Sequence, residues 1–413
     1  MNIIQLQVRS ICIITLLGVM FSIVPLMGQN NQSIPAYHIY AGNTHSHSIY
    51  TSSHGSQWDH IPGATKFMEV DSAGVSHVIN STLKENWEKY QGLPSVHYAL
   101  AKSNGYDFYA VTDHSQEAGF HPTDPSNSTW LSAKIAADEA ADQNFVALRG
   151  FEFSENNGPN GKGHINVFNT AIYMNALEKG IDLQYFYKWL KSVPANGDGA
   201  VVASFNHSGA EQYNNWDYRT SEVTDIITML EVINSNKNIH YQAFINALDK
   251  GWKVSPVCGN DSHGIGGIKT STSRTFVLAT DKTKVAILDA MKNRRTYASL
   301  DHNIQCRYTV NDKIMGSTLS GEKVFRFDIL INDPDTNNPG NKITKIDIVK
   351  DGGEVVQTYD VPIPDYSVQW SPTINDASNK YFFVRIWNAC GGEAPKSDPQ
   401  KPMTWLAPVW TGR

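Results

Sequence analysis

The chain has 413 residues, a formal net charge of −6 at pH 7 and a sequence pI near 6.1. Hydrophobic residues make up 41% and aromatic residues 11% of it, which is ordinary for a globular protein with buried cores. The length suffices for two domains, or for one large barrel with an appendage. No basic run is present, and binding to a phosphate backbone needs clustered cations, so we expect no nucleic-acid partner.

The first thirty residues are typical of a secretory signal. Arg9 precedes the apolar run 11–21, and small and polar residues follow from Gly28. We therefore expect residues 1–29 to be removed on export, which would leave a periplasmic or extracellular protein without a stable membrane span. An uncleaved anchor is the alternative, although the apolar run is short for a span.

Residues 36–302 alternate short apolar runs with helix-period stretches, which predicts β/α units. A first strand is expected near Ile39, and further strands at 108–111, 145–150, 200–205 and 254–258. Each of these four later runs delivers a ligand-type residue at or just beyond its end. In a barrel of parallel strands that end carries the active site. Helices are expected at 96–104, 132–143, 183–193, 239–250 and 282–293, and residues 56–95 read as an insertion.

Residues 303–413 have an all-β character. The segments 324–329 and 346–348 alternate apolar and polar residues, and turn signals such as Asn338-Pro339-Gly340 separate the strands. This predicts a small β-sandwich domain. Cys306 and Cys390 could pair in an oxidising compartment, whereas Cys258 reads as a buried small hydrophobe.

A cluster of histidines begins after the first strand. His45 and His47 are two residues apart, so on a strand they share a face and both imidazoles can reach one ion. His54 follows in a Ser/Gly-rich turn. A lone His-x-His pair is as often a surface accident, but three histidines within ten residues favour a metal site.

Further ligand-type residues follow the predicted strands. Asp113-His114 and Asp261-Ser262-His263 each end an apolar run, and burying an aspartate or a histidine there without a partner would cost free energy. Glu152 lies between two phenylalanines and needs a positive partner; a salt bridge with Arg149 or a lysine is the alternative to a metal. His164 and His207, taken singly, would more often be structural histidines.

Together these residues resemble the PHP (polymerase and histidinol phosphatase) metal-dependent hydrolases over about residues 40–300. The motifs that carry the resemblance are His45-x-His47, Thr112-Asp113-His114, Gly150-x-Glu152, His164, His207 and Asn260-Asp261-Ser262-His263. Within the family the chain is most similar to exported members with a C-terminal β domain, a group that includes carbamate-cleaving enzymes.

The resemblance implies a distorted seven-stranded β/α barrel that holds two to three divalent ions. One ion would take His45, His47, Glu152 and Asp261; a second would take Glu152, His164 and His207; a third would take His54, His114 and His263. The sequence departs from the family pattern at Thr51-Ser52-Ser53-His54-Gly55, where relatives commonly carry Ser-Asp-Gly. His54 would have to replace that acid.

Imidazole and carboxylate ligands suit Zn, Mn or Fe. Such ions lower the pKa of a bridging water, and the resulting hydroxide would attack the substrate. Glu152 would bridge two ions, His114 or His263 would protonate the leaving group, and Asp113 would orient a ligand. The resemblance favours a small phosphate ester as substrate, with candidate contacts at Lys162, Lys237, Arg274, Arg294 and Arg295.

Two alternatives stay open. The first is a hydrolase of the same fold that acts on a carbamate, an amide or another non-phosphate ester. The second is a ligand- or carbohydrate-binding protein with an inert barrel, in which aromatic side chains of the β domain supply stacking surfaces. The candidates for such surfaces are Trp370, Trp387, Trp405 and Trp410.

Overall fold

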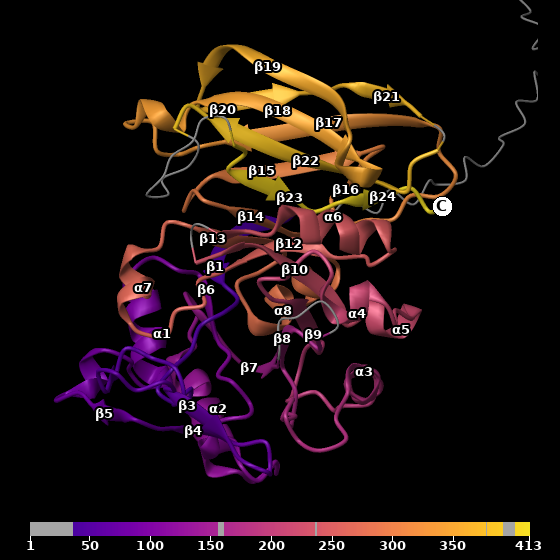
Figure 1. The fold of residues 1–413 in the computed structure, drawn as a ribbon. Coiled ribbons are helices and arrows are strands. Elements are labelled where there is room, and N and C mark those ends of the chain that lie inside the picture. Colours follow the sequence, from indigo (N-terminus) through magenta and orange to yellow (C-terminus); the bar gives the residue numbers. More distant parts are fainter. Residues whose placement is uncertain (1–35, 156–160, 236–237, 377, 391–400) are drawn as a thin grey trace, which may run out of the picture. The chain divides into compact units, whose positions relative to one another are not determined.

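The computed structural model describes residues 36–155, 161–235, 238–376, 378–390 and 401–413 (Figure 1). The expected signal segment, residues 1–29, lies outside this part of the chain. Among the described residues, no helix is both long and apolar enough to cross a membrane.

One long mixed sheet runs through the unit formed by Tyr37–Arg413. Its first part has the strand order β11 (Asn238–Ile239), β10 (Ile227–Asn234), β9 (Val202–Phe205), β8 (His164–Phe168), β7 (Val146–Ser154), β6 (Phe108–Val111), β1 (His38–Asn43), β13 (Arg274–Ala279) and β14 (Thr296–Ser299). In addition, β12 (Ser255–Gly259) pairs with β10.

The strands of this part run in both directions. Neighbours pair in parallel at β1–β6, β6–β7, β9–β10 and β10–β12. By contrast, β8 is antiparallel to both β7 and β9, and β13 is antiparallel to β1 and β14. The start of β8 therefore lies at the edge where β7 and β9 end. Every residue of β6, β7, β9, β10 and β12 is buried, as expected for strands covered on both faces.

Backbone pairing does not close these strands into a barrel, because among the described residues β12 pairs with β10 but not with β13 or β14. Side chains make the remaining link: Thr275 Oγ1 of β13 donates to the Cys258 carbonyl at 2.8 Å, and Thr296 Oγ1 of β14 donates to the Pro256 carbonyl at 2.9 Å. The architecture is thus mixed α/β with a large sheet that contains parallel strands, and its description as a seven-stranded barrel stays a prediction.

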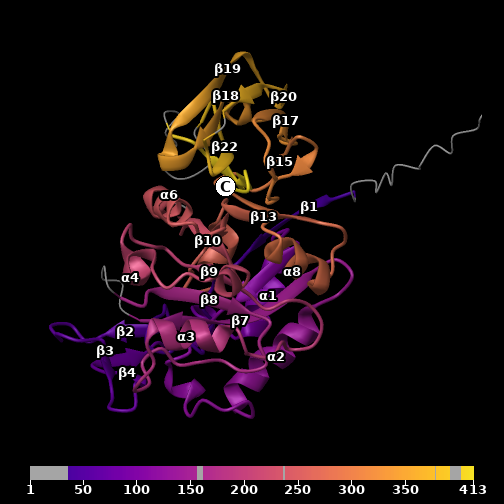
Figure 2. The same cartoon turned by 90° about the vertical axis from the view of Figure 1, so that its right-hand side faces the viewer.

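The five expected helices are present, on both sides of the strands (Figure 2). They are α1 (Pro94–Ser103), α2 (Ser128–Ala140), α3 (Leu183–Leu190), α6 (Tyr241–Asp249) and α8 (Lys284–Lys292). The start of α2 precedes the expected one because the side chain of Asn127 caps the helix by accepting from the Trp130 N–H. Shorter elements are α4 (Gln212–Trp216), α5 (Ser221–Thr224), α7 (Gly266–Thr270), η1 (Trp87–Lys89), η2 (Ala118–Phe120), η3 (Pro339–Asn341) and η4 (Asp351–Gly353).

The insertion at residues 56–95 contains two small hairpin sheets. In one, β2 (Trp58–His60) pairs with β5 (Ser81–Leu83), and in the other, β3 (Met68–Val70) pairs with β4 (Ser76–Val78). These strands are short and mostly exposed, which is why no clear period marks them in the sequence.

The C-terminal part is antiparallel β, and the expected boundary at residues 302 and 303 falls in the connection between β14 and β15. The long sheet continues from β14 through β23 (Thr404–Leu406), β22 (Tyr381–Asn388), β18 (Ile343–Lys350) and β19 (Val355–Asp365), with β24 (Val409–Trp410) beside β22. A second sheet holds β16 (Lys313–Ile314), β15 (Gln305–Val310), β17 (Val324–Asn332), β20 (Ser367–Trp370) and β21 (Thr373–Asn375). Alternate residues of β17 are buried, and Phe325 packs against Phe382 of the other sheet with ring centroids 4.9 Å apart.

Two possibilities that the sequence left open for this part are not realised among the described residues. Trp387, Trp405 and Trp410 are at most 5% exposed, so they pack in the core and cannot serve as stacking surfaces. Trp370 is half-buried and stacks on Tyr359. Cys306 and Cys390 are not bonded to each other in this structure.

Candidate metal centre

The sequence-predicted ligands gather at one edge of the sheet. His45 and His47 follow β1, Asp113-His114 follow β6, His207 follows β9, and Asp261 and His263 follow β12. Glu152 lies near the end of β7, and His164 opens β8, whose reversed direction brings it to the same edge. Isolated bridges between Ser46 and Ser262 and between His114 and Glu152 extend the pairing into this region.

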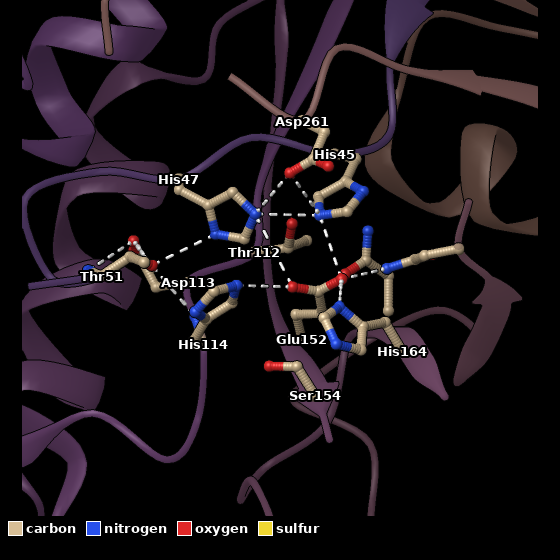
Figure 3. A network of polar contacts seen from close by, with 12 residues as sticks. His45, His47, Thr51, Thr112, Asp113, His114, Glu152, Ser154, His164 and Asp261 are labelled. Carbon is tan, nitrogen blue, oxygen red and sulfur yellow. Dashed lines mark hydrogen bonds and ion pairs between the residues drawn. The ribbon is translucent and has the colours of Figure 1, made fainter. Parts of the chain in front are cut away.

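Glu152 is the centre of the cluster and is fully buried (Figure 3). Its Oε1 lies 3.3 Å from His45 Nε2, 3.2 Å from His164 Nδ1 and 3.5 Å from His207 Nε2. Its Oε2 lies 2.9 Å from His114 Nε2. The alternative salt bridge with Arg149 is absent, because that guanidinium donates to the carbonyls of Trp130 and Thr170.

His45, His47 and Asp261 form a second side of the cluster. The two Nε2 atoms are 3.0 Å apart, and Asp261 Oδ1 lies 3.1 Å from Nε2 of His47 and 3.6 Å from Nε2 of His45. Figure 3 shows these nitrogens pointing toward Glu152 and Asp261. The atoms of the group His45, His47 and Glu152, and likewise those of Glu152, His164 and His207, lie within 4.8 Å of one another.

The hydrogen bonds outside the cluster define the tautomers of His45 and His47. Nδ1 of His45 lies 2.8 Å from Glu231 Oε1, and an ionised carboxylate can only accept, so this nitrogen carries the hydrogen. Nδ1 of His47 lies 3.1 Å from Thr51 Oγ1, whose single hydrogen is donated to Asp113. Nδ1 of His47 must therefore donate as well. When both rings are neutral, their Nε2 atoms carry lone pairs that face each other and two carboxylates. Without a metal ion, protonation of His45 relieves this crowding: burial opposes the charge, but Glu231, Glu152 and Asp261 raise the pKa of His45 well above its ordinary value.

A cation satisfies this arrangement. Lone pairs and carboxylate oxygens repel when they converge without a positive charge between them. In addition, Glu152 Oε2, His114 Nδ1 and His164 Nδ1 are buried without an aligned hydrogen bond among the described residues. The donors are imidazole and carboxylate, a set that suits Zn, Mn or Fe. The residues therefore fit metal ions, and Glu152 belongs to two of the possible ligand groups.

The electrostatics of the cluster show competition between burial and charge. Burial opposes ionisation of Glu152 and Asp261, but the histidines around them, His45 foremost, lower both pKa values well below the usual range. Burial would lower the pKa of His114, yet Glu117 and Glu152 raise it to about 10. The pKa of His263 is lowered to about 4, because burial outweighs the attraction of Asp261.

The structure divides the residues expected for a third ion between two possible ligand groups, one of His47, His114 and His263 and one of His54, His114 and Glu117. The His54 ring centroid lies 5.6 Å from that of His114 and 5.8 Å from that of His263. The sequence reading missed Glu117, whose Oε1 lies 3.5 Å from His114 Nδ1 and which forms a possible ligand group with His54 and His114. Glu117 also accepts hydrogen bonds from Ser53, which holds the turn that carries His54. Glu117 thus places a carboxylate beside His54, in the segment 51–55 where relatives of similar sequence commonly carry an aspartate.

Asp113 faces away from the cluster centre. Its Oδ1 accepts from the Ser48 N–H at 2.7 Å and from Thr51 Oγ1 at 2.9 Å, and its Oδ2 accepts from Ser48 Oγ at 2.7 Å. Through Thr51 this carboxylate orients the ring of His47. Burial raises the pKa of Asp113 to about 6 even though these hydrogen bonds act to lower it.

Glu231 is the main residue that the sequence reading missed. It lies in the middle of β10, fully buried, and besides His45 it accepts from the His207 N–H at 2.8 Å and from Asn234 Nδ2 at 3.1 Å. It therefore fixes ligands from two strands. Gly259 leaves the room that this requires, because a Cβ there would overlap Glu231 Oε1 and the Cβ of His45. The signal in the sequence was a lone acid inside the apolar run 227–233.

Backbone strain accompanies two ligand positions. His207 has φ 26° and Asp261 has φ 46°, both in the left-handed region that non-glycine residues seldom adopt. Hydrogen bonds hold each conformation: the His207 N–H donates to Glu231, and the Asp261 N–H donates to the carbonyl of His45 at 3.0 Å. Such strain is a frequent companion of functional sites.

The cations proposed as phosphate contacts are engaged elsewhere. Arg274 donates to the carbonyls of Ser271 and Ser273 and stacks on Tyr106. The other described candidates likewise donate to main-chain carbonyls, namely Lys162 to residues 176 and 181, Arg294 to residues 224 and 253, and Arg295 to residue 278. Lys237 lies outside the described residues.

No protein-family model matches the chain, and no curated protein matches it. Among solved structures, it is similar to a two-domain protein from Bacteroides vulgatus that is described as containing a predicted PHP-like metal-dependent phosphoesterase. The two sequences are 15% identical, the match covers 90% of this chain and 96% of that one, and the TM-score is 0.45. It is also similar to the lesion-specific endonuclease PfuEndoQ from Pyrococcus furiosus, with 12% identity, 74% and 62% covered, and a TM-score of 0.31.

Proposed function

We propose that the chain is an exported, multinuclear metal-dependent hydrolase of the PHP type that acts on phosphate esters. The observation that carries the proposal is the convergence of the Nε2 atoms of His45 and His47 on the carboxylates of Glu152 and Asp261. Two carboxylates and two imidazole nitrogens buried at these distances need positive charge among them, and a bound cation supplies it.

The allocation of ligands follows the groups described above. One ion would be held by His45, His47, Glu152 and Asp261, a second by Glu152, His164 and His207, and a third by His54, His114 and His263 with Glu117 in reach. Bound ions of this kind supply a water of lowered pKa and neutralise negative charge that develops on the substrate.

His263 is better situated than His114 to exchange a proton with a leaving group. Its side chain is 28% exposed, whereas that of His114 is 6% exposed and lies between Glu117 and Glu152. Nδ1 of His263 lies 3.2 Å from the Asp261 carbonyl, which can only accept, so Nδ1 donates and only Nε2 remains, either to bind the third ion or, where that ion is absent, to accept a proton.

A second candidate function is hydrolysis of an uncharged carbamate or amide ester. The observation that favours it is the engagement of Arg274, Arg294, Arg295 and Lys162 with main-chain carbonyls, which gives each of these cations a structural role outside the histidine cluster. A phosphate ester would then depend on the metal ions alone for charge neutralisation. This dependence favours diesters, with one negative charge, over monoesters.

The decisive experiment is a substrate screen of the full chain loaded with Zn or Mn. Aryl phosphomonoesters, phosphodiesters, carbamate esters and a single-stranded oligonucleotide form its four arms, with Glu152→Gln as the inactive reference. We expect turnover of a phosphoester that Glu152→Gln loses. Turnover of the carbamate alone would replace the first candidate by the second, and an equal rate in Glu152→Gln would refute both.

Export is proposed from residues 1–29 and is tested separately. Expression of the full chain in a Gram-negative host, followed by fractionation and mass determination, should give a periplasmic form that lacks these residues. Full-length protein that stays in the membrane fraction would contradict cleavage.

A further inference from the structure

A second group of buried acids lies far along the chain from the histidine cluster, where β14 leads into β15. Asp301 and Asn303 belong to the loop that precedes β15, and Asp333 begins the turn after β17. Gln305 pairs with Asn332 in the antiparallel ladder of these strands. The loop and the turn therefore leave the same end of the ladder, and the carboxylate of Asp301 lies close enough to act on the pKa of Asp333.

Three oxygen atoms of this group are buried without a hydrogen-bond partner among the described residues: Asp301 Oδ2, Asp333 Oδ2 and Asn303 Oδ1. Asp301 and Asp333 are 0% and 1% exposed. The other oxygen of each carboxylate is engaged, since Asp301 Oδ1 accepts from the N–H groups of Asn303 and Ile304, and Asp333 Oδ1 accepts from that of Asp335. Each carboxylate is thus held in place with its second oxygen unsatisfied, at a cost in free energy.

The two carboxylates also form no direct ion pair among the described residues, and the electrostatic partner of Asp301 is the buried Arg274, which acts from beyond ion-pair distance. No lysine, arginine or histidine in the described part of the chain forms an ion pair with Asp301 or Asp333. Burial and the neighbouring Asp301 raise the pKa of Asp333 to about 6, which is the effect of two like charges close together in a poorly solvated place. A positive charge between the carboxylates would remove both the repulsion and the unsatisfied acceptors.

We propose that Asp301, Asp333 and the amide oxygen of Asn303 bind a hard divalent cation of the Ca²⁺ class at the junction between β14 and the C-terminal sheets. All three donors are oxygens, the ligands that Ca²⁺ prefers, in contrast with the imidazole-rich cluster of the candidate metal centre. Carbonyl oxygens and water would complete the coordination. The ion would join the loop before β15 to the turn after β17.

This site is independent of the proposed hydrolase activity, and a nearby phenol gives it an optical readout. Tyr297 is buried, its hydroxyl donates to the Ile304 carbonyl at 2.8 Å and accepts from the Cys306 N–H at 3.1 Å, and Asp301 acts on its pKa. Tb³⁺ has the ligand preference of Ca²⁺ and emits when an adjacent phenol is excited. Tb³⁺ is therefore the probe of choice.

The experiment titrates Tb³⁺ into the full chain after its histidine cluster has been loaded with Zn. Wild type should give saturable emission with one Tb³⁺ per chain, displaced by millimolar Ca²⁺. Asp333→Asn should weaken Tb³⁺ binding at least tenfold, whereas the exposed control Asp365→Asn should bind as wild type does. Emission that is equal in wild type and Asp333→Asn, or absent from wild type, overturns the proposal.

A second measurement covers the case in which Asp333→Asn fails to fold. Asn303→Ala keeps both charges and should still lose Tb³⁺ affinity several-fold, and Ca²⁺ should raise the melting temperature of wild type more than that of this variant. If Ca²⁺ raises neither melting temperature while Asp301→Asn is more stable than wild type, the two carboxylates share a proton and the proposal is refuted.

Discussion

Replacing Glu231 by glutamine should weaken metal binding although Glu231 is not itself a ligand. All three groups that contact this carboxylate are donors, namely His45 Nδ1 at 2.8 Å, the His207 N–H at 2.8 Å and Asn234 Nδ2 at 3.1 Å. A glutamine amide must turn its NH₂ group toward at least one of them in either orientation. The substitution therefore replaces an attraction with a collision of two N–H groups.

The magnitude follows from the loss of one charge-assisted hydrogen bond, which is worth about 1.5–3 kcal/mol in a buried place. Since about 1.4 kcal/mol corresponds to a factor of ten, metal affinity should fall roughly 10- to 100-fold. Loss of a partner that orients a ligand has effects of about this size in other metal sites. Turnover at saturating metal should change less than affinity, because the ligands themselves remain.

The assay is competition for Zn between the protein and a chromophoric chelator, with Glu139→Gln on the exposed face of α2 as the matched control. The control should have wild-type affinity. An affinity of Glu231→Gln within a factor of two of wild type would refute the reasoning, and so would an equal loss in the control.

Three other perturbations probe the same cluster. Gly259→Ala should lower both the metal content and the melting temperature, because a Cβ there overlaps Glu231 and the Cβ of His45. Elemental analysis and thermal unfolding measure these two quantities, and wild-type values in both would show that the space beside Gly259 is not needed. His54→Ala should reduce turnover less than His47→Ala, since His47 contacts Asp261 at 3.1 Å whereas His54 is exposed; equal losses in steady-state rates would make the third metal as essential as the others. The metal-free protein should lose stability as pH rises from about 6.5 toward 10. The reason is that the pKa of His114 is about 10 in the folded protein against an ordinary 6.5, so its protonation stabilises the folded state fully below pH 6.5 and no longer above pH 10. Denaturant unfolding of metal-free wild type and His114→Gln measures this, and an equal pH dependence of the free energy of unfolding in the two proteins would contradict it.

The regular elements of the first part were predictable because burial leaves a clear trace in the sequence. Continuous apolar runs marked β6, β7, β9 and β12, and polar residues that follow such runs are expensive to bury without a partner. The position of His164 at the same sheet edge could not be derived in this way. It depends on β8 running antiparallel to its neighbours, and strand direction is a tertiary property.

The residues that support the ligands were harder to find. Glu231 lies in the middle of β10 rather than at a strand end, so a search for strand-end ligands misses it. Glu117 lies in a loop without any period and reaches His114 only through the fold. Aromatic content alone does not distinguish a binding surface from a core, so the sequence left both roles open for the β-domain tryptophans, and burial places Trp387, Trp405 and Trp410 in the core.

The central claim is that His45, His47, Glu152 and Asp261 hold metal ions, and elemental analysis of the purified chain tests it most directly. After reconstitution with Mn or Zn and removal of free metal, wild type should contain two to three ions per chain. Glu152→Gln should contain at least one ion fewer, because its carboxylate lies within 3.5 Å of histidines from both ligand groups. Wild-type protein that is folded yet retains no metal under these conditions would contradict the account.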